Sequence, residues 1–170
     1  MKKLYTMLLL VISLCTASCS DWLDVSPSNQ VNGDKLFEIG DGYRNALNGI
    51  YLNLGTSSMY GQTMSWGFMD AIAQYYKTDN GSNFIPKTSA YYKSAKFQFE
   101  DSDVKTFISN IWSVSYNNIA NCNNLILNVS EASPSIFKEG EFEKNMIWGE
   151  ALALRAFMHF DLLRLFAPAI

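Results

Sequence analysis

The sequence predicts an all-α fold of stacked helices joined by long irregular loops. Three segments repeat apolar residues at three- and four-residue spacings, the periodicity of an amphipathic helix, and they span residues 35–54, 102–129 and 141–166. The stretches between them are rich in Gly, Asn, Ser and Pro, which favour turns. With 48% hydrophobic and 17% charged residues among 170, the composition is globular and supplies enough apolar material for one packed domain.

The first predicted helix runs from about residue 35 to 54 and ends at the Gly-Thr-Ser-Ser turn of residues 55–58. Three glycines, Gly40, Gly42 and Gly49, are expected to weaken it because glycine is a poor helix former. Its apolar stripe consists of Leu36, Ile39, Tyr43, Leu47, Ile50 and Leu54.

Between residues 59 and 100 the pattern is less regular. The stretch 59–76 is rich in Met and aromatic residues and suggests a second helix from Thr63 onward. Residues 77–100 carry the turn sequence Asp-Asn-Gly-Ser-Asn and Pro86, so we expect a long loop there.

The long central helix is predicted to start at an N-cap in Asp101-Ser102-Asp103 and to extend to Val129. Cys122 lies on its apolar stripe, where burial as a small hydrophobic residue is expected. The stripe comprises Ile108, Ile111, Ile119, Cys122, Ile126 and Val129. Another face carries Asn117, Asn118, Asn121, Asn123, Asn124 and Asn128. Asparagine is a poor helix former, so packing against other helices must stabilise this one.

The last predicted helix, residues 141–166, has two apolar faces separated by two polar lanes. One face holds Ile147, Ala151, Leu154, Met158 and Leu165, and the other holds Leu152, Ala153, Ala156, Phe160 and Leu163. The first lane holds Glu143, Glu150, Asp161 and Arg164, and the second holds Lys144, Asn145, Arg155 and His159. A helix with two apolar faces must be covered on both sides, as an inner helix of a stacked array is. Because the chain stops directly after this helix, we expect it to be truncated.

Residues 1–18 have the three-part layout of an export signal peptide: a basic start, an apolar run over residues 7–14 and the small residues Thr-Ala-Ser. The apolar run is shorter than the roughly 20 residues that a membrane-spanning helix needs. A cysteine directly after the small residues is where a lipoprotein signal peptidase cuts, so we expect Cys19 to be lipidated rather than the protein to be simply secreted. Residues 19–34 would then form an extended leader, and residues 35–170 the helical domain.

The charges and motifs exclude several functional classes. Removing Lys2 and Lys3 from the 13 basic residues leaves 11 against 16 acidic residues, a net charge of −5, and the basic residues are scattered. Nucleic-acid binding needs clustered Lys and Arg, so it is not expected. The sequence has no Gly-rich phosphate loop, no Gly-x-Ser-x-Gly and no His-Glu-x-x-His, and His159 has no partner at metal-ligand spacing. We therefore expect no enzyme activity, cofactor or metal site.

Four segments together resemble the amino-terminal region of the SusD/RagB family of nutrient-binding outer-membrane lipoproteins. Their order and spacing carry the resemblance, which covers essentially the whole mature chain. The segments are Cys-Ser-Asp-Trp-Leu-Asp at 19–24 with Pro27, Ala-Leu-Asn-Gly-Ile-Tyr at 46–51, the set Trp112, Tyr116, Ile119, Asn123 and Ile126, and Gly-Glu-Ala-Leu-Ala-Leu-Arg-Ala-Phe at 149–157 running into Phe-Asp-Leu-Leu-Arg-Leu-Phe at 160–166.

The resemblance implies tetratricopeptide-like helix pairs, one surface that caps a SusC-like TonB-dependent outer-membrane barrel transporter and another that binds an oligosaccharide. It also implies a lipid-anchored protein on the cell outer membrane, facing the exterior, that passes a glycan or another nutrient to the transporter. The alternative is a helical-repeat scaffold whose only ligands are protein partners.

Sugar recognition needs flat aromatic faces beside amide groups, and the region of residues 66–92 contains both. The candidates are Tyr91, Tyr92, Asn80, Asn83, Trp66, Tyr75 and Tyr76. Tyr91 and Tyr92 are favoured, because Trp66 has Met-rich surroundings that indicate core packing, which is also the alternative for Tyr75. Trp112 and Tyr116 lie at helical spacing and are expected in the core. Arg155 and Glu150 are expected to make polar contacts between helices.

Overall fold

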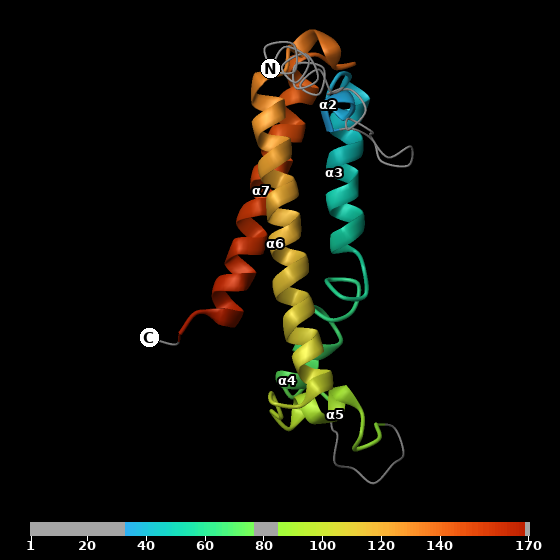
Figure 1. The fold of residues 1–170 in the computed structure, drawn as a ribbon, viewed down its shortest axis with the longest axis vertical. Helices are drawn as coiled ribbons and strands as arrows, with labels where there is room; N and C mark the ends of the chain where they lie inside the picture. The colour runs from blue at the N-terminus through green and yellow to red at the C-terminus, as the bar shows by residue number, and fades with distance from the viewer. Residues whose placement is uncertain (1–32, 77–84, 169–170) are drawn as a thin grey trace, which may run out of the picture. The chain divides into compact units, whose positions relative to one another are not determined.

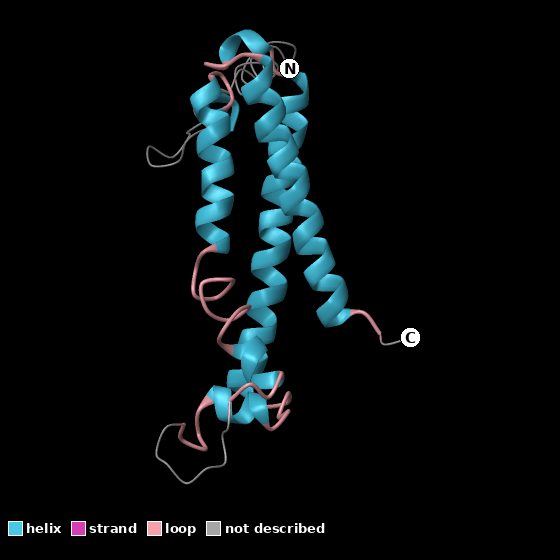
Figure 2. Cartoon of the chain, turned by 180° about the vertical axis from the view of Figure 1, so that it is seen from behind, coloured by secondary structure: helices cyan, strands magenta, loops and turns pink. Residues whose placement is uncertain are grey.

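The computed structural model describes residues 33–76 and 85–168, and in these ranges it is all-α without a strand, which confirms the predicted fold class (Figures 1 and 2). Residues 36–170 form one compact unit, and the contacts given below lie within it. The elements are α2 (Gly33–Leu36), α3 (Gly40–Leu54), α4 (Phe68–Ile72), α5 (Ala90–Ala95), α6 (Ser102–Glu131), the short 3-10 helix η1 (Pro134–Ile136) and α7 (Glu141–Phe166). Among the helices of these ranges, none combines the length and apolar character needed to cross a bilayer.

The first predicted helix is interrupted, and its glycines explain why. A Cβ atom on Gly42 would lie 1.6 Å from the backbone oxygen of Leu36, and one on Gly40 would lie 2.6 Å from that of Ile136. Both glycines therefore allow the chain to pass close to the start of α3, whereas the sequence suggested only that they weaken a continuous helix. Beyond them α3 is regular to Leu54 and buries Tyr43, Leu47, Ile50 and Leu54.

Helix α6 begins where the sequence predicted. The side chain of Asp101 accepts a hydrogen bond from the backbone N–H of Asp103 at 2.9 Å, which satisfies one free donor of the first turn. The helix continues two residues beyond the predicted end at Val129. Its buried apolar residues are Val104, Ile111, Ile119, Cys122, Leu125 and Val129, which confirms the predicted stripe at four positions. Ile108 and Ile126 are partly buried beside it.

The first polar lane of α7 faces α3. Arg44 donates to Glu143, and the Tyr51 hydroxyl donates to Glu150 at 2.8 Å. Each pair is 99 residues apart, so α3 and α7 run parallel in a fixed register. Glu143 is fully buried, and it also accepts from the backbone N–H of Glu139 at 3.1 Å.

The second polar lane of α7 faces α6, to which α7 is antiparallel. Arg155 donates to the Asn123 side-chain oxygen at 2.9 Å, and Lys144 donates to the backbone oxygen of Ala132 at 2.8 Å. The expectation that Glu150 and Arg155 make polar contacts between helices is thus confirmed. α3, α6 and α7 lie side by side in both ribbon views (Figures 1 and 2).

Only one apolar face of α7 is covered. Ile147, Ala151 and Met158 are completely buried in the main core cluster with α3 and α6. The opposite face is exposed over its whole length, at Leu152, Ala153, Ala156, Phe160 and Leu163. Among the described residues nothing covers the second face, because the two polar lanes direct both neighbours to the same half of α7. That another element covers this face, as the two apolar faces of the sequence suggest, stays a prediction.

A smaller core cluster joins α4 to the amino-terminal half of α6. Phe68, Val104 and Ile111 are its buried members, with Met64 and Phe107 among the side chains packed against them. The helix predicted from Thr63 is wrong: residues 55–67 form consecutive turns, and only Phe68–Ile72 is helical. The turns are stabilised by side chains such as Thr63, whose hydroxyl donates to the backbone oxygen of Ser57 at 2.8 Å. Within the predicted loop over 77–100, Ala90–Ala95 is helical.

Candidate functional site

An aromatic hollow of about 260 Å³ lies beside α5 and is bordered by the segments that precede and follow α4. It is lined by Trp66, Gly67, Tyr76, Ile85 and Tyr91, and we call these five residues the aromatic hollow. Trp66 and Gly67 come from the turns before α4, Tyr76 follows α4, and Tyr91 belongs to α5. Three of the aromatic residues that the sequence selected are therefore brought to one place.

Trp66 is on the surface, so the preferred core placement is wrong. Its side chain is 57% exposed, and its indole N–H donates to the backbone oxygen of Gly61 at 3.1 Å. The Tyr76 hydroxyl donates to the backbone oxygen of Trp66 at 2.5 Å. The indole N–H and this hydroxyl are thus both bonded to backbone, which leaves the ring faces as the available surface. Met64, rather than Trp66, packs on the core.

Tyr91 is held from two sides. Its hydroxyl accepts a hydrogen bond from the Gln62 side chain at 2.8 Å. Its ring stacks on Phe107 of α6, with centroids 5.3 Å apart and an interplanar angle of 27°. Phe107 in turn contacts Phe68 at 5.5 Å, which connects the hollow to the smaller core cluster. No pattern in the sequence marks Gln62. Phe107 was not predicted either, although its spacing of three and four residues from Val104 and Ile111 could have indicated it.

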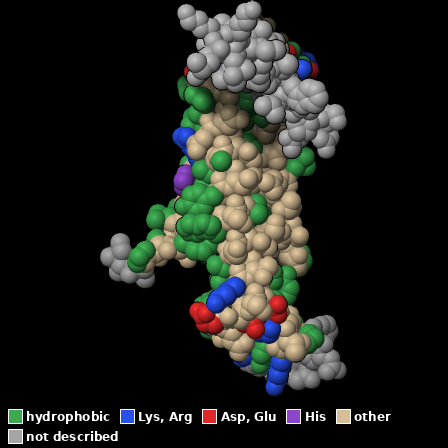
Figure 3. All heavy atoms as spheres, in the orientation of Figure 1, with side chains coloured by type: hydrophobic (Ala, Val, Ile, Leu, Met, Phe, Trp, Pro, Cys, Tyr) green, Lys and Arg blue, Asp and Glu red, His purple; other side chains and the backbone are tan. Residues whose placement is uncertain are grey.

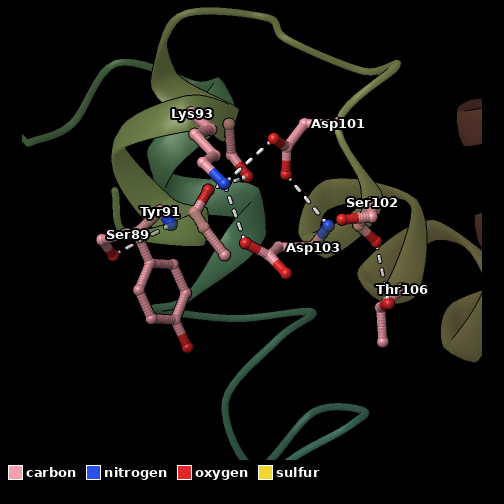
Figure 4. A network of polar contacts seen from close by, with 9 residues as sticks. Ser89, Tyr91, Lys93, Asp101, Ser102, Asp103 and Thr106 are labelled. Atoms are coloured by element: carbon pink, nitrogen blue, oxygen red, sulfur yellow. Dashed lines mark hydrogen bonds and ion pairs between the residues drawn. The ribbon is translucent and has the colours of Figure 1, made fainter. Parts of the chain in front are cut away.

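Helix α5 is fixed to the start of α6 by ion pairs. The Lys93 ammonium lies 2.9 Å from an Asp101 carboxylate oxygen and 2.8 Å from one of Asp103 (Figure 4). Hydrogen bonds to the two carboxylates, first to Asp103 and then to Asp101, raise the pKa of Lys93. The hydrogen bond from the Lys93 ammonium lowers the pKa of Asp101. Both shifts favour the charged forms of Lys93 and Asp101. Ser89 caps α5 by accepting from the backbone N–H of Tyr91 at 3.3 Å.

Two residues that follow α4 and α5 have left-handed backbone conformations. Gln74 has φ of 62° and Phe97 has φ of 56°, and neither is a glycine. Such conformations cost about 1 kcal/mol or more and persist only where the surroundings hold them. The conformation of Gln74 is stabilised by a hydrogen bond: its side chain donates to the backbone oxygen of Ala95 at 2.8 Å. This bond connects the end of α4 to the end of α5.

Of the other described candidates, neither Tyr75 nor Tyr92 is among the residues that line the hollow. Tyr75 is 79% exposed, so its core alternative is also wrong. Tyr92 is partly buried, with its ring 5.7 Å from the Lys96 ammonium. Asn80 and Asn83 lie outside the described residues.

A second hollow, of about 290 Å³, lies between α6 and the end of α7. Trp112 and Tyr116 line it with His159, and both rings are about half exposed although the sequence predicted them in the core. Their centroids are 4.7 Å apart, and Phe166 meets Trp112 edge-on at 5.0 Å. Figure 3 shows hydrophobic side chains gathered next to the single histidine. The prediction failed because helical spacing identifies a face but not whether a neighbouring element covers it.

The described lining of the aromatic hollow offers aromatic ring faces to a ligand. Among the described residues, its lining holds three ring faces and no ionisable acid or base apart from the hydroxyls of Tyr76 and Tyr91, both of which are hydrogen-bonded. In the part of the chain that the structure describes, no group of three or more His, Cys, Asp or Glu side chains is placed to hold a metal ion. Cys122 is buried as expected, and desolvation raises the pKa of its thiol, which disfavours the reactive thiolate.

Comparison with known proteins identifies the family. The model of a SusD-like family, described as "Starch-binding associating with outer membrane", matches residues 21–170. No curated protein and no solved structure matches the chain. Since the match covers nearly the whole chain, and the all-α architecture agrees with it, the chain belongs to this SusD-like family of starch-binding, outer-membrane-associated proteins.

Proposed function

We propose that this chain is a non-catalytic surface lipoprotein that binds a glycan and delivers it to a SusC-like TonB-dependent outer-membrane transporter. One observation carries the proposal: Trp66, Tyr76 and Tyr91, separated by up to 25 positions, line a single open hollow. The family description supports starch or a related glycan as the ligand.

The geometry suits the flat face of a pyranose ring. The C–H groups of that face are apolar, and aromatic rings have electron-rich faces on which such groups pack. The Trp66 indole and the Tyr76 and Tyr91 hydroxyls are hydrogen-bonded within the protein, so the rings lose little conformational freedom on binding. The hollow therefore supplies stacking, while the sugar hydroxyls stay in contact with water or with residues outside the lining.

Affinity gels containing soluble starch test the site. Trp66→Ala and Tyr91→Ala should each reduce retention of the chain on the gel, because each removes one stacking face. Trp148→Ala is the matched control, since Trp148 is a partly exposed tryptophan on α7 outside the hollow. Unchanged retention of both hollow variants would remove this site. Tyr92→Ala distinguishes the two adjacent tyrosines, because only Tyr91 lines the hollow. Retention should therefore fall in Tyr91→Ala and stay unchanged in Tyr92→Ala.

Anchoring is proposed to occur through Cys19, after removal of residues 1–18 as a signal peptide, with residues 19–34 as the leader to the helical domain. The support is the sequence layout and the family's association with the outer membrane. Intact-mass spectrometry of native material should give a chain that begins at Cys19 and carries acyl chains. A bare Cys19, or residues 1–18 still attached, would contradict it.

The family resemblance supports two further parts of the proposal: delivery of the glycan to a transporter, and tetratricopeptide-like stacking of the helix pairs. The parallel register of α3 and α7 on either side of α6 supports that stacking. Co-expression with a SusC-like barrel should yield a complex that survives purification in detergent.

A scaffold that binds only proteins is the second candidate, and the exposed apolar face of α7 favours it. Large exposed side chains such as Phe160 and Leu163 are typical of surfaces that contact another protein. A glycan panel measured without any transporter separates the two: binding of a sugar by the chain alone favours the first function.

A further inference from the structure

Helix α5 carries both a ring of the aromatic hollow and the residue that anchors the helix. Tyr91 and Lys93 are two positions apart, so they leave the helix in different directions. Figure 4 shows the Lys93 side chain directed at Asp101 and Asp103, while the Tyr91 ring extends away from these carboxylates. A helix of six residues has no stability of its own, so its contacts with neighbouring elements set its position.

The two side chains contact one face of α6. Lys93 pairs with Asp103, and Tyr91 stacks on Phe107, which is one turn further along the same helix. The second partner of Lys93, Asp101, also caps α6, so the same carboxylate fixes the start of α6 and the end of α5. The side chain of Lys93 is 19% exposed, and those of Asp101 and Asp103 are 27% and 55% exposed.

We propose that Lys93 is a positioning residue of the aromatic hollow, which holds the Tyr91 ring in place through its ion pairs with Asp101 and Asp103. The inference rests on the proposed glycan function and deepens it, because it predicts how binding is regulated. An uncharged glycan gives no salt dependence by itself. Ion pairs that reach solvent are screened by salt, so binding of such a glycan weakens as ionic strength rises.

The test measures the affinity of the purified chain for maltoheptaose, an uncharged starch fragment, at low and high NaCl. Lys93→Met should weaken binding about three- to tenfold, the value of one aromatic contact, and should abolish the salt dependence. Lys93→Arg should restore both affinity and salt dependence. Lys105→Met is the matched control: Lys105 lies on α6 near the same helix start, but its ion pair at 2.6 Å is with Glu100, which is outside α5, so this variant should behave like wild type.

The proposal is overturned if Lys93→Met binds like wild type, or if it loses affinity while the salt dependence persists. Nuclear Overhauser effects between the Tyr91 and Phe107 rings test the positioning without any glycan. They should weaken in Lys93→Met and persist in Lys105→Met; their persistence in Lys93→Met refutes the positioning role. If these effects weaken in Lys93→Met but the wild-type chain binds no glycan, the positioning role of Lys93 stands and only the proposed function fails. Asp103→Asn, which removes one ion pair without changing side-chain length, replaces Lys93→Met should that variant not fold.

Discussion

Asn118 illustrates how a residue that disfavours a helix can still stabilise the fold. It is completely buried in α6, where its amide donates to the backbone oxygen of Val114 at 3.1 Å. Its side-chain oxygen accepts from Asn53 of α3, also at 3.1 Å. The sequence indicated that packing must compensate for the asparagines of α6, but it did not indicate which of the six is buried. That distinction depends on where α3 lies.

Replacing the buried and an exposed asparagine should have opposite effects. Asn118→Ala leaves Asn53 without its partner in a partly buried site, so the free energy of unfolding should fall by about 1–3 kcal/mol. Asn121→Ala, at an exposed position of the same helix, should raise it by up to about 0.7 kcal/mol because alanine is the better helix former. Urea denaturation measures both, and equal effects at the two positions would contradict the role of Asn118.

Glu143 should make stability depend on pH in the acid range. Its hydrogen bond from the Glu139 backbone, followed by the contact with Arg44, holds the pKa of its carboxyl below the ordinary value of 4.5. The charged form therefore stabilises the fold above that value, and this contribution is lost as the pH falls through the lowered pKa. Glu143→Gln should be less stable than wild type at neutral pH and should lose less stability on acidification.

The control for this experiment is Glu141→Gln, an exposed position in the same first turn of α7. It should follow wild type in a series of thermal melts between neutral and acid pH. A Glu143→Gln variant with the same pH profile as wild type would show that the buried carboxylate does not contribute as described.

At the scale of elements, the two longest helices were predictable and the short ones were not. α6 and α7 extend over several periods of their apolar patterns, and α6 has a capping sequence, so local signals define them. The break before α3, the turns of residues 55–67 and helix α5 depend on tertiary contacts. Examples are the approach of the Ile136 backbone to Gly40 and the hydrogen bond from Gln74 to Ala95, each of which joins distant parts of the sequence.

Two glycines of α3 should respond in opposite ways to alanine. A Cβ on Gly42 would overlap the backbone oxygen of Leu36, so Gly42→Ala must displace the chain and should be strongly destabilising. A Cβ on Gly49 meets nothing within 4 Å, so Gly49→Ala should stabilise the helix by about 0.5–1 kcal/mol. Thermal denaturation compares the variants, and a stable Gly42→Ala would contradict the close approach.

At the scale of the whole molecule, the chemistry of the candidate site was predictable but its assembly was not. The sequence selected Trp66, Tyr76 and Tyr91 as suitable residues, yet it favoured Trp66 for the core. Composition around a residue does not reveal that a turn at the surface binds the indole N–H. The same limitation applies to Trp112, since periodicity could not say that its ring stays about half exposed in the described chain.

The one-sided packing of α7 predicts a sharp contrast between its faces. Met158 is completely buried, so Met158→Ala should lower the free energy of unfolding by about 2–5 kcal/mol. Leu163 is 64% exposed, so Leu163→Gln should change it by no more than about 0.5 kcal/mol. Urea denaturation of the two variants tests the assignment of the faces. A large loss in Leu163→Gln would mean that the outer face is covered in solution.

The central claim is that a glycan binds at the aromatic hollow. The chain has four tryptophans, and each gives one indole N–H signal in a nitrogen–proton correlation spectrum, which single Trp→Phe variants assign. On titration with maltoheptaose, the Trp66 signal should shift, while those of Trp112 and Trp148 should stay in place. A titration that shifts Trp112 or Trp148 instead, or that shifts no indole signal at all, would contradict the account.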